Sequence, residues 1–441
     1  MTQVTLEQML SAREERVLRQ KNLLSKYDCP VICFTMNIAG PVKHTPLIER
    51  AFDEGIKILE NSLSRIKIND KIRIVASTGC EMLLSADAEA SFLKEICIKA
   101  EDFAPIGRLF DMDVLDTNGE KLSRDNLRGC LVCGAPGRGC SARRLHSADE
   151  LFKKTNEIIC EHFRSLDCDH FARIATECLI AEARTTPKPG LVDMENTGSH
   201  TDMDLNMFIK SARALTPYFA KCIEIGQCSA QKPQEVFPKL RSVGLCAEKA
   251  MYEATDGVNT HKGAIYSLGI ICGALGTLWS AENPYPETER IFEMCSLITK
   301  KAVENDFQNI DCSTAGGRLF LQKGIKGIRG EAAEGFPSVK NISLPVFEKA
   351  VHEGYCENDA GCIALLHLIS EVDDTNIYSR GGDVGSTFAK KEAKRVLEST
   401  PLPTKAQIEA LDKKFTERNL SPGGCADLLA VTYFIHKIKT L

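Results

Sequence analysis

Hydrophobic positions follow two different patterns along the chain. Up to about residue 150, short runs rich in β-branched and aromatic residues alternate with runs of helical periodicity. Residues 30–38, 72–78 and 107–116 favour strands, whereas residues 48–66 favour a helix. This alternation predicts an α+β domain with a modest mixed sheet.

Beyond about residue 149 the pattern becomes one helix after another. Within residues 169–185, apolar positions recur at i, i+3, i+4 and i+7 and form one stripe, which here includes Glu182, until Pro187 ends the helix. Similar runs predict further helices at 245–255, 291–304, 360–372, 388–397 and 428–438. Thr404 and Gln407 have the form of a capping box. The chain is therefore predicted to hold an α+β domain over residues 1–155 and an all-α domain over residues 156–441.

Composition narrows the class of protein. The chain has 441 residues, 43% of them hydrophobic and 26% charged, as in soluble globular proteins of more than one domain. Its net charge of −5 argues against a nucleic-acid partner, and its polar N-terminus lacks a secretory signal, which predicts a cytoplasmic protein. The longest apolar run, residues 263–279, is too short and glycine-rich for a membrane span. It predicts a buried helix packed closely through Gly269, Gly273 and Gly276, and no membrane partner.

Five glycine-flanked polar clusters lie at the ends of predicted helices. They are TPKPGLVDMENTGSHTDMD (186–204), GVNTHKG (257–263), GIRGEAAEGFP (327–337), VDDTNIYSRGG (372–382) and SPGGCADLL (421–429). Helix N-termini offer free N–H groups, glycine permits close backbone approach, and Lys or Arg adds positive charge. One such cluster is more often a helix cap or a surface ion pair. Five clusters that mix carboxylates with bases favour a magnesium–triphosphate site.

In this order, these motifs resemble the triphosphoribosyl-dephospho-CoA synthase family (CitG type) over roughly residues 160–441. The resemblance implies that ATP is joined to 3′-dephospho-CoA, that adenine is released, and that the triphosphate stays on the ribose. It also implies an all-helical fold, which the periodicity indicates independently. In such a reaction the 2′-hydroxyl attacks the anomeric carbon of the ATP ribose, and a carboxylate takes a proton or stabilises positive charge.

The clusters supply candidates for each role. The catalytic carboxylate is Asp193, Asp202 or Glu331, and the sequence does not rank them. Mg²⁺ on the triphosphate, together with nearby basic side chains, would hold the nucleotide. The basic candidates are Lys188, His200, His261, Lys262, Arg329 and Arg380.

In the first domain, Asp111 and Asp113 stand two apart in a β-like run. They therefore project from one face, with their Cα atoms about 7 Å apart, while Phe110, Met112 and Val114 take the other face. Such a pair can hold Mg²⁺ for attack on a phosphate, although an ordinary solvent-facing strand has the same pattern.

The motifs CFTMNIAGPVKHT, VASTGCEMLLS, GRLFDMDVLDTNGEKLSR and CLVCGAPGRGCSARRLH resemble the phosphoribosyl-dephospho-CoA transferases, or holo-citrate-lyase carrier-protein synthases (CitX type), over roughly residues 5–155. The resemblance implies transfer of the prosthetic group to a serine of the acyl carrier protein (γ) subunit of citrate lyase, with release of diphosphate. A likeness to nucleotidyltransferases gives Asp111 and Asp113 the metal-binding role and places Arg108 and Arg124 near phosphate. The usual Gly-Ser signature of those enzymes is absent from the sequence.

Cys130, Cys133, Cys140 and His146 form a CxxC pair followed by a third cysteine and a histidine. This set has the residue types of a structural zinc site. In a chain with nineteen cysteines, such a spacing can also arise by chance. The neighbouring Arg138, Arg143 and Arg144 could instead meet diphosphate or an acidic carrier protein.

Together the resemblances imply a two-step enzyme that makes and attaches the citrate lyase prosthetic group. Two alternatives stay open. The system could serve the carrier protein of malonate decarboxylase, or the N-terminal half could be a docking module for the carrier protein, with the C-terminal half the only enzyme.

Overall fold

The computed structural model describes residues 2–124, 128–135, 140, 143, 145–309, 315–399 and 403–441. By its internal contacts the chain divides into two compact units. Unit 1 comprises Met1–Ser165 with Ser280–Glu282, and unit 2 comprises Leu166–Trp279 with Asn283–Leu441. The division at residue 165 falls within one long helix, α5, and the sequence-based boundary at residue 155 falls within the same helix.

The elements follow the two patterns of the sequence. Unit 1 begins with α1 (Leu6–Tyr27), β1 (Val31–Met36), α2 (Pro46–Ser62), β2 (Ile68–Ala76), β3 (Gly79–Ala86), α3 (Ala90–Asp102), the 3-10 turn η1 (Pro105–Leu109) and β4 (Phe110–Leu115). Helices then dominate: α5 (Ala148–Arg184), α6 (Leu205–Ala214), α7 (Thr216–Cys228), η2 (Pro233–Glu235), α8 (Val236–Ala254), α9 (Lys262–Leu278), α10 (Thr288–Gln308), α11 (Ala315–Lys323), α12 (Gly327–Ala333), η3 (Val339–Ser343), α13 (Leu344–His352), α14 (Glu357–Glu371), α15 (Thr375–Ser399), α16 (Lys405–Glu417) and α17 (Gly423–Thr440).

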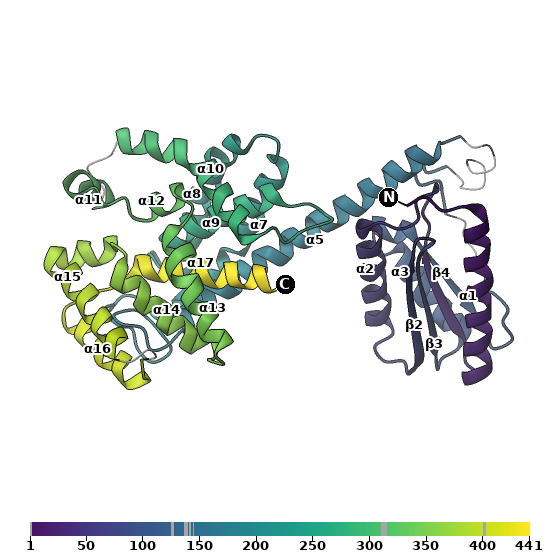
Figure 1. Ribbon diagram of the computed structural model, residues 1–441, viewed down its shortest axis with the longest axis horizontal. Helices are drawn as coiled ribbons and strands as arrows, with labels where there is room; N and C mark the ends of the chain where they lie inside the picture. Colours follow the sequence, from purple (N-terminus) through teal and green to yellow (C-terminus); the bar gives the residue numbers. More distant parts are fainter. Residues whose placement is uncertain are drawn as a thin grey trace. The chain divides into compact units, whose positions relative to one another are not determined.

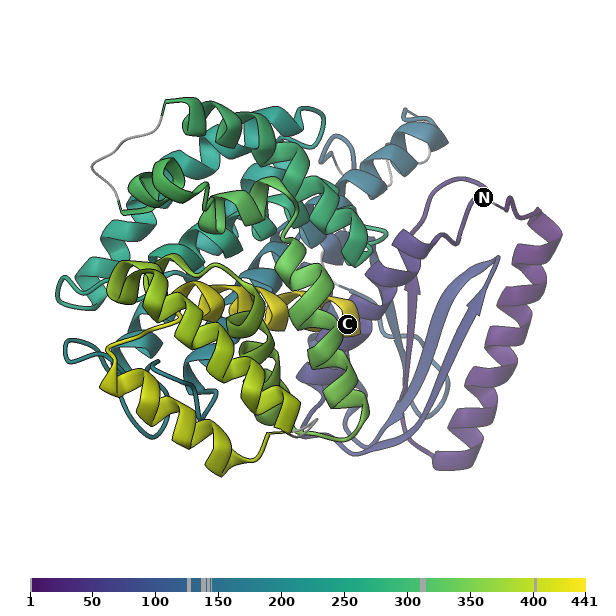
Figure 2. The same ribbon diagram turned by 60° about the vertical axis from the view of Figure 1, so that its left-hand side comes forward.

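The predicted α+β class of the first unit is confirmed. Among its described residues, the sheet has the strand order β2-β3-β1-β4, and every neighbouring pair is antiparallel, where a mixed sheet was predicted. Helix α1 covers one face and α2 with α3 the other (Figures 1 and 2). On the α2 side, the rings of Phe34 and Phe52 stack with their centroids 4.7 Å apart.

Strand β3 has no counterpart among the strands expected from the sequence. From Cys80 to Ala86 each of its residues is buried, because helices cover both faces of the sheet. A strand buried on both faces loses the alternation of apolar and polar residues that identifies strands in a sequence.

The predicted all-α class of the second part is also confirmed. Helix α17, yellow in Figure 1, runs among the other helices of unit 2, and ten of its side chains are buried. The predicted capping box is present at α16, where the Thr404 side chain accepts from the N–H of Gln407 and Gln407 bonds back to Thr404.

Helix α9 is the glycine-rich apolar segment, and it is buried along almost its whole length. A Cβ on Gly276 would collide with the carbonyl oxygen of Ile223 in α7, and one on Gly273 would lie 2.8 Å from a methyl group of Leu240 in α8. The predicted close packing through these glycines is therefore present. Among the described helices, none combines the length and the apolar character needed to cross a membrane.

Candidate active site and metal centre

The five polar clusters converge on one cavity in unit 2. Each contributes to a wall that encloses about 780 Å³, within the roughly 300–1,000 Å³ usual for small-molecule sites. Six of the predicted site residues line it: Lys188, His200, His261, Lys262, Glu331 and Arg380. Asp193, Asp202 and Arg329 are not part of this wall.

Helices α9, α12, α15 and α17 begin at the wall, because the first residue of each lines the cavity. Their positive dipole ends favour negative charge there, and the protein supplies part of it. Asp374 accepts from N–H groups of α15 and α17, and Asp427 accepts from the N–H of Ala264 in α9. A Cβ on Gly263, at the start of α9, would collide with the carboxylate of Asp427. Glycine at this position therefore lets a carboxylate of α17 pack directly against the first turn of α9.

Asp193 organises the loop that precedes α6. One of its oxygens accepts from the Thr186 hydroxyl at 2.9 Å and the Lys188 N–H at 3.0 Å, and the other accepts from the N–H groups of Glu195 and Asn196 at 2.7 and 2.9 Å. The residue is 97% buried, and the hydrogen-bonding capacity of its carboxylate is used by its own loop. The structure therefore places Asp193 behind the cavity wall, where it holds the loop in shape.

Lys188 is a buried wall residue with a fixed counter-ion. Its Nζ donates to the carboxylate of Glu182 at 2.6 Å and to the Glu182 carbonyl oxygen at 2.7 Å. Both side chains are at most 5% exposed. The pair places a positive and a negative charge in the same part of the wall, which also includes Glu182.

His200 and Arg380 form a hydrogen-bonded group at another part of the wall. The guanidinium of Arg380 donates to the carbonyl oxygen of Ser199 at 2.9 Å and lies 3.2 Å from Nδ1 of His200, while Nε2 of His200 lies 2.9 Å from the Ser421 hydroxyl. Burial, followed by the charge of Arg380, lowers the pKa of His200. Asp202 lies 3.9 Å from the same imidazole, with 64% of its side chain exposed.

His261 is buried at the N-terminus of α9 and is a neutral imidazole. Burial, followed by the charge of Lys188, lowers its pKa to about 3. Thr260 donates to the Ser211 hydroxyl at 2.8 Å, and Ser211 lies 2.7 Å from Nδ1 of His261. Since the Ser211 oxygen accepts from Thr260, its hydrogen can be donated to Nδ1, which leaves the ring hydrogen on Nε2. Nε2 is buried and has no hydrogen-bond partner among the described residues.

Three aspartates that are not among the site candidates named from the sequence also line the wall: Asp373, Asp374 and Asp427. Asp374 accepts from the N–H groups of Asn376 and Cys425 at 2.7 and 2.8 Å, so it caps the first turns of both α15 and α17. Asp427 lines the cavity and is half-buried. Burial raises its pKa well above the usual range, and the charges of Glu182 and Asp374 add to the shift, while the Ala264 N–H opposes it.

Sequence patterns gave little signal for Asp427 or Glu182. Glu182 falls in the apolar stripe of α5, and Asp427 falls among the leucines that begin α17. The one signal in the sequence was that each carboxylate lies in an otherwise apolar stretch. Burying a charged side chain costs free energy unless it has a partner or a function.

Glu331 lies on α12 with its carboxylate held by one neighbour. Ser338 donates to it twice, from its hydroxyl at 2.6 Å and from its N–H at 3.2 Å. Burial raises the pKa of Glu331, and the two bonds from Ser338 partly oppose that shift.

Arg329 lines a second cavity of about 710 Å³, which shares Lys262, Gly263 and Ile328 with the first. Its other walls include the rings of Phe237 and Tyr266. Lys262, which belongs to both cavities, bonds Glu248 at 2.8 Å. The predicted basic residues are thus divided between two adjoining cavities.

In unit 1, Asp111 and Asp113 leave β4 on the face opposite Phe110, Met112 and Val114, which are completely buried. Lys121 pairs with Asp113 at 2.5 Å. Asp111 is exposed at the surface, but neighbouring atoms partly shield its carboxyl from water. This desolvation raises the pKa of Asp111, and the negative charge of Asp113 raises it further. The two carboxylates therefore share a face, as the alternation of the strand predicts.

The arginines predicted to lie near phosphate have other partners. Arg124 pairs with Glu101 and Asp102 of α3, and Arg108 donates to the carbonyl oxygen of Gly129 at 2.5 Å. Among the described residues, Lys121 is the basic side chain that pairs with Asp113. Arg143 is exposed, whereas Arg138 and Arg144 fall outside the described residues.

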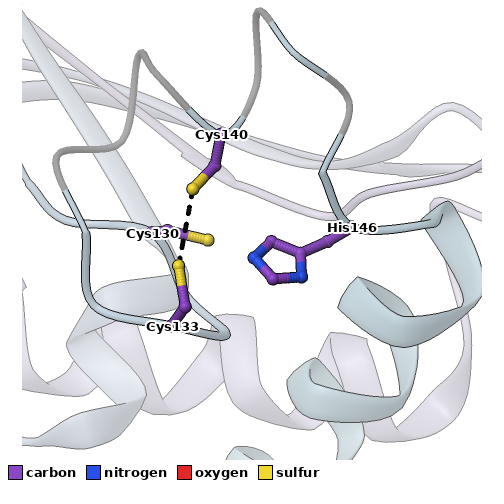
Figure 3. A group of neighbouring side chains, drawn as sticks. All are labelled: Cys130, Cys133, Cys140 and His146. Carbon is purple, nitrogen blue, oxygen red and sulfur yellow. Dashed lines mark hydrogen bonds between the residues drawn. The ribbon is translucent and has the colours of Figure 1, made fainter.

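Cys130, Cys133, Cys140 and His146 come together after β4 (Figure 3). One possible ligand atom from each lies within 4.8 Å of those of the other three. Among the described residues, no other set of three or more His, Cys, Asp and Glu side chains is as close. Sulfur and imidazole ligands are those of structural zinc sites.

Comparisons with known proteins define the class. The family described as ATP:dephospho-CoA triphosphoribosyl transferase (CitG) matches residues 168–441. The family described as apo-citrate lyase phosphoribosyl-dephospho-CoA transferase (CitX) matches residues 4–162. The chain is therefore a bifunctional transferase, and both resemblances seen in the sequence are confirmed.

Two relatives contain both parts in one chain. Protein CitXG of Haemophilus influenzae is 36% identical to this chain, and the match covers 98% of this chain and 96% of the relative's length. Protein CitXG of Leuconostoc mesenteroides subsp. cremoris is 32% identical, over 99% of this chain and 97% of its own. The chain belongs to the CitXG family, in which both transferase parts serve the synthesis of the citrate lyase prosthetic group.

Proposed function

We propose that unit 2 joins ATP to 3′-dephospho-CoA and that unit 1 transfers the product to the acyl carrier protein (γ) subunit of citrate lyase. In the first step, the 2′-hydroxyl of dephospho-CoA forms a bond to the anomeric carbon of the ATP ribose. The bond from that carbon to adenine breaks, and the triphosphate stays on the ribose. The convergence of all five polar clusters on one cavity carries this proposal.

ATP occupies the first cavity in this proposal. The positive ends of α9, α15 and α17 line this cavity and favour the phosphates through their dipoles, while Asp374 and Asp427 use some of their N–H groups. His200 with Arg380 adds hydrogen-bond donors. Asp373, whose side chain is 51% exposed at the wall, is the proposed carboxylate ligand for Mg²⁺, which binds one or two carboxylates together with substrate phosphates. The oxygens of Asp374 already accept from backbone N–H groups. When bound, Mg²⁺ neutralises charge on the triphosphate.

Asp427 is the proposed general base. A base with a raised pKa accepts a proton more readily near neutral pH than an ordinary aspartate does, and burial raises the pKa of Asp427. Glu331 lies in the same wall and can stabilise positive charge on the ribose. The Nε2–H of neutral His261 can donate to a nitrogen of the departing adenine, because it has no other partner among the described residues.

The second cavity is the proposed site for the pantetheine arm and diphosphate of dephospho-CoA. Its aromatic and aliphatic walls suit the arm, and Arg329 and Lys262 suit the diphosphate. Its junction with the first cavity at Lys262 and Gly263 would bring the 2′-hydroxyl toward the ATP ribose.

Arg329→Ala tests this assignment. We expect the KM for dephospho-CoA to rise about tenfold, which corresponds to about 1.4 kcal/mol for one lost charged contact, while the KM for ATP changes less than about twofold. Arg173→Ala, at an exposed position of α5, is the matched control. A rise in the KM for ATP alone would place the nucleotide, not dephospho-CoA, beside Arg329.

Unit 1 carries out the second step in this proposal. The carrier serine hydroxyl forms a bond to the α-phosphorus of the triphosphoribosyl group, the bond to the β-phosphate breaks, and diphosphate leaves. Asp111 and Asp113 supply oxygen ligands for Mg²⁺, and Lys121 adds positive charge beside them. The departing diphosphate can take up the serine proton.

The whole proposal is tested by adding the substrates in order. The chain is first incubated with ATP, Mg²⁺ and dephospho-CoA while adenine is followed by chromatography, and apo carrier protein is then added and its mass measured. We expect adenine in the first stage, and in the second a carrier heavier by one phosphoribosyl-dephospho-CoA group. Absence of adenine would overturn the first step, and adenine with an unmodified carrier would overturn the second.

A further inference from the structure

The segment between β4 and α5 folds so that four ligand side chains face one point. Figure 3 shows the thiols of Cys130, Cys133 and Cys140 gathered beside the imidazole of His146, with one ring nitrogen turned toward the sulfurs. Neither transferase step proposed above uses these four side chains.

A tight backbone turn brings the first two cysteines together. The N–H of Gly134 donates to the carbonyl oxygen of Cys130 at 2.9 Å, and the N–H of Cys130 donates to that of Ala135 at 2.6 Å. Gly134 has a φ of +71°, which glycine adopts without strain. A Cβ on Gly129 would collide with the carbonyl oxygen of Gly134, so glycine is needed there too. The turn therefore presents both thiols of the CxxC pair from the same end of the loop.

The distances fit a metal ion better than a disulfide. The sulfur atoms of Cys133 and Cys140 lie 3.4 Å apart, whereas a disulfide bond is about 2.05 Å long. Four ligands about 2.3 Å from a central zinc ion lie about 3.8 Å from one another. The ligand atoms of the four side chains all lie within 4.8 Å of one another, so small rotations bring them to that spacing.

The histidine provides an independent indication. Nε2 of His146 is buried and has no hydrogen-bond partner among the described residues. A buried ring nitrogen without a partner is costly, and a metal ion at the centre of the group would satisfy it.

We propose that Cys130, Cys133, Cys140 and His146 bind one zinc ion in a closed tetrahedral site that stabilises the segment joining β4 to α5. Four protein ligands leave no open position, so the ion has a structural role. Binding displaces the thiol protons to solvent, because the thiolate is the ligand form. The same segment contains Arg128, which bonds Glu101 of α3 at 2.6 Å and the carbonyl oxygen of Phe110 in β4 at 2.8 Å, so the site supports contacts to the sheet.

The test is the metal content of the full chain, purified under reducing conditions without chelator. We expect one zinc ion per chain by elemental analysis, and tetrahedral cobalt–thiolate absorption bands after exchange with Co²⁺. Cys133→Ser should lower the zinc content at least about tenfold, whereas Cys246→Ser, at an exposed position of α8, should leave it unchanged.

A second measurement covers the case in which Cys133→Ser does not fold. Wild-type chain is stripped of metal with a chelator and titrated with Zn²⁺ against a colorimetric competitor. Saturable uptake of one zinc ion per chain supports the site. Absence of both native zinc and saturable uptake would overturn it, as would a Cys133–Cys140 disulfide found by mass spectrometry in the chain as purified.

Discussion

Asp427→Asn is expected to lower the rate of adenine release by about 10²–10⁴-fold, the usual contribution of a general base. The amide keeps the size of the side chain but cannot accept the proton of the 2′-hydroxyl. Adenine release is measured with saturating ATP and dephospho-CoA. Asp169→Asn, at an exposed position of α5, is the matched control and should keep the wild-type rate.

The same substitution should not destabilise the protein. The pKa of Asp427 is raised in the folded state, so the folded state binds the proton more tightly than the unfolded chain does. The ionised carboxyl therefore destabilises the fold increasingly as pH rises from its unfolded pKa toward its folded pKa. Asparagine carries no charge, and we expect the Tm at neutral pH to be unchanged or to rise by about 2–4 °C, or about 1 kcal/mol. Loss of activity with a lowered Tm would indicate misfolding instead.

The pH profile separates a base from a binding residue. If Asp427 must lose its proton to act, adenine release by the wild type rises with pH through the raised pKa of this carboxyl. The residual activity of Asp427→Asn should not show this rise with pH. If the variant keeps the same rise in adenine release with pH, the titrating group is another residue, such as Glu331, whose pKa is also raised by burial.

Asp111→Asn combined with Asp113→Asn is expected to lower carrier modification at least about 100-fold, because a metal ion supplies several kcal/mol of stabilisation to phosphoryl chemistry. Adenine release should stay at the wild-type rate, since that reaction is proposed for unit 2. The measurement supplies purified triphosphoribosyl-dephospho-CoA and apo carrier protein, and it follows the mass of the carrier.

This double variant also decides between an enzyme and a docking module for unit 1. Asp111 is exposed and Asp113 is half-buried, so their replacement should change the Tm little. Asp87→Asn, at an exposed position after β3, is the control. Carrier modification that survives both substitutions would favour the docking interpretation.

Much of the fold followed from local patterns in the sequence. The spacing of apolar residues in 169–185 indicated a helix, and the Thr404–Gln407 capping box appears as predicted. Both signals depend on neighbours within one or two turns, which a sequence displays directly. Strand β3 was not predicted from the sequence, because helices cover both of its faces and only the tertiary structure creates that burial.

The sequence by itself determined which segments carry the chemistry: five polar clusters, an aspartate pair on a strand and a Cys/His group. Only the tertiary structure decided how individual side chains within them are used. It placed Asp193 behind the cavity wall, Arg329 in an adjoining cavity, and Glu182 and Asp427 in the wall itself. The physical reason is that the partners, burial and pKa of a charged group depend on residues distant in the chain. Asp427 shows this directly, because its pKa is set by burial and by Glu182 and Asp374 from two other helix ends.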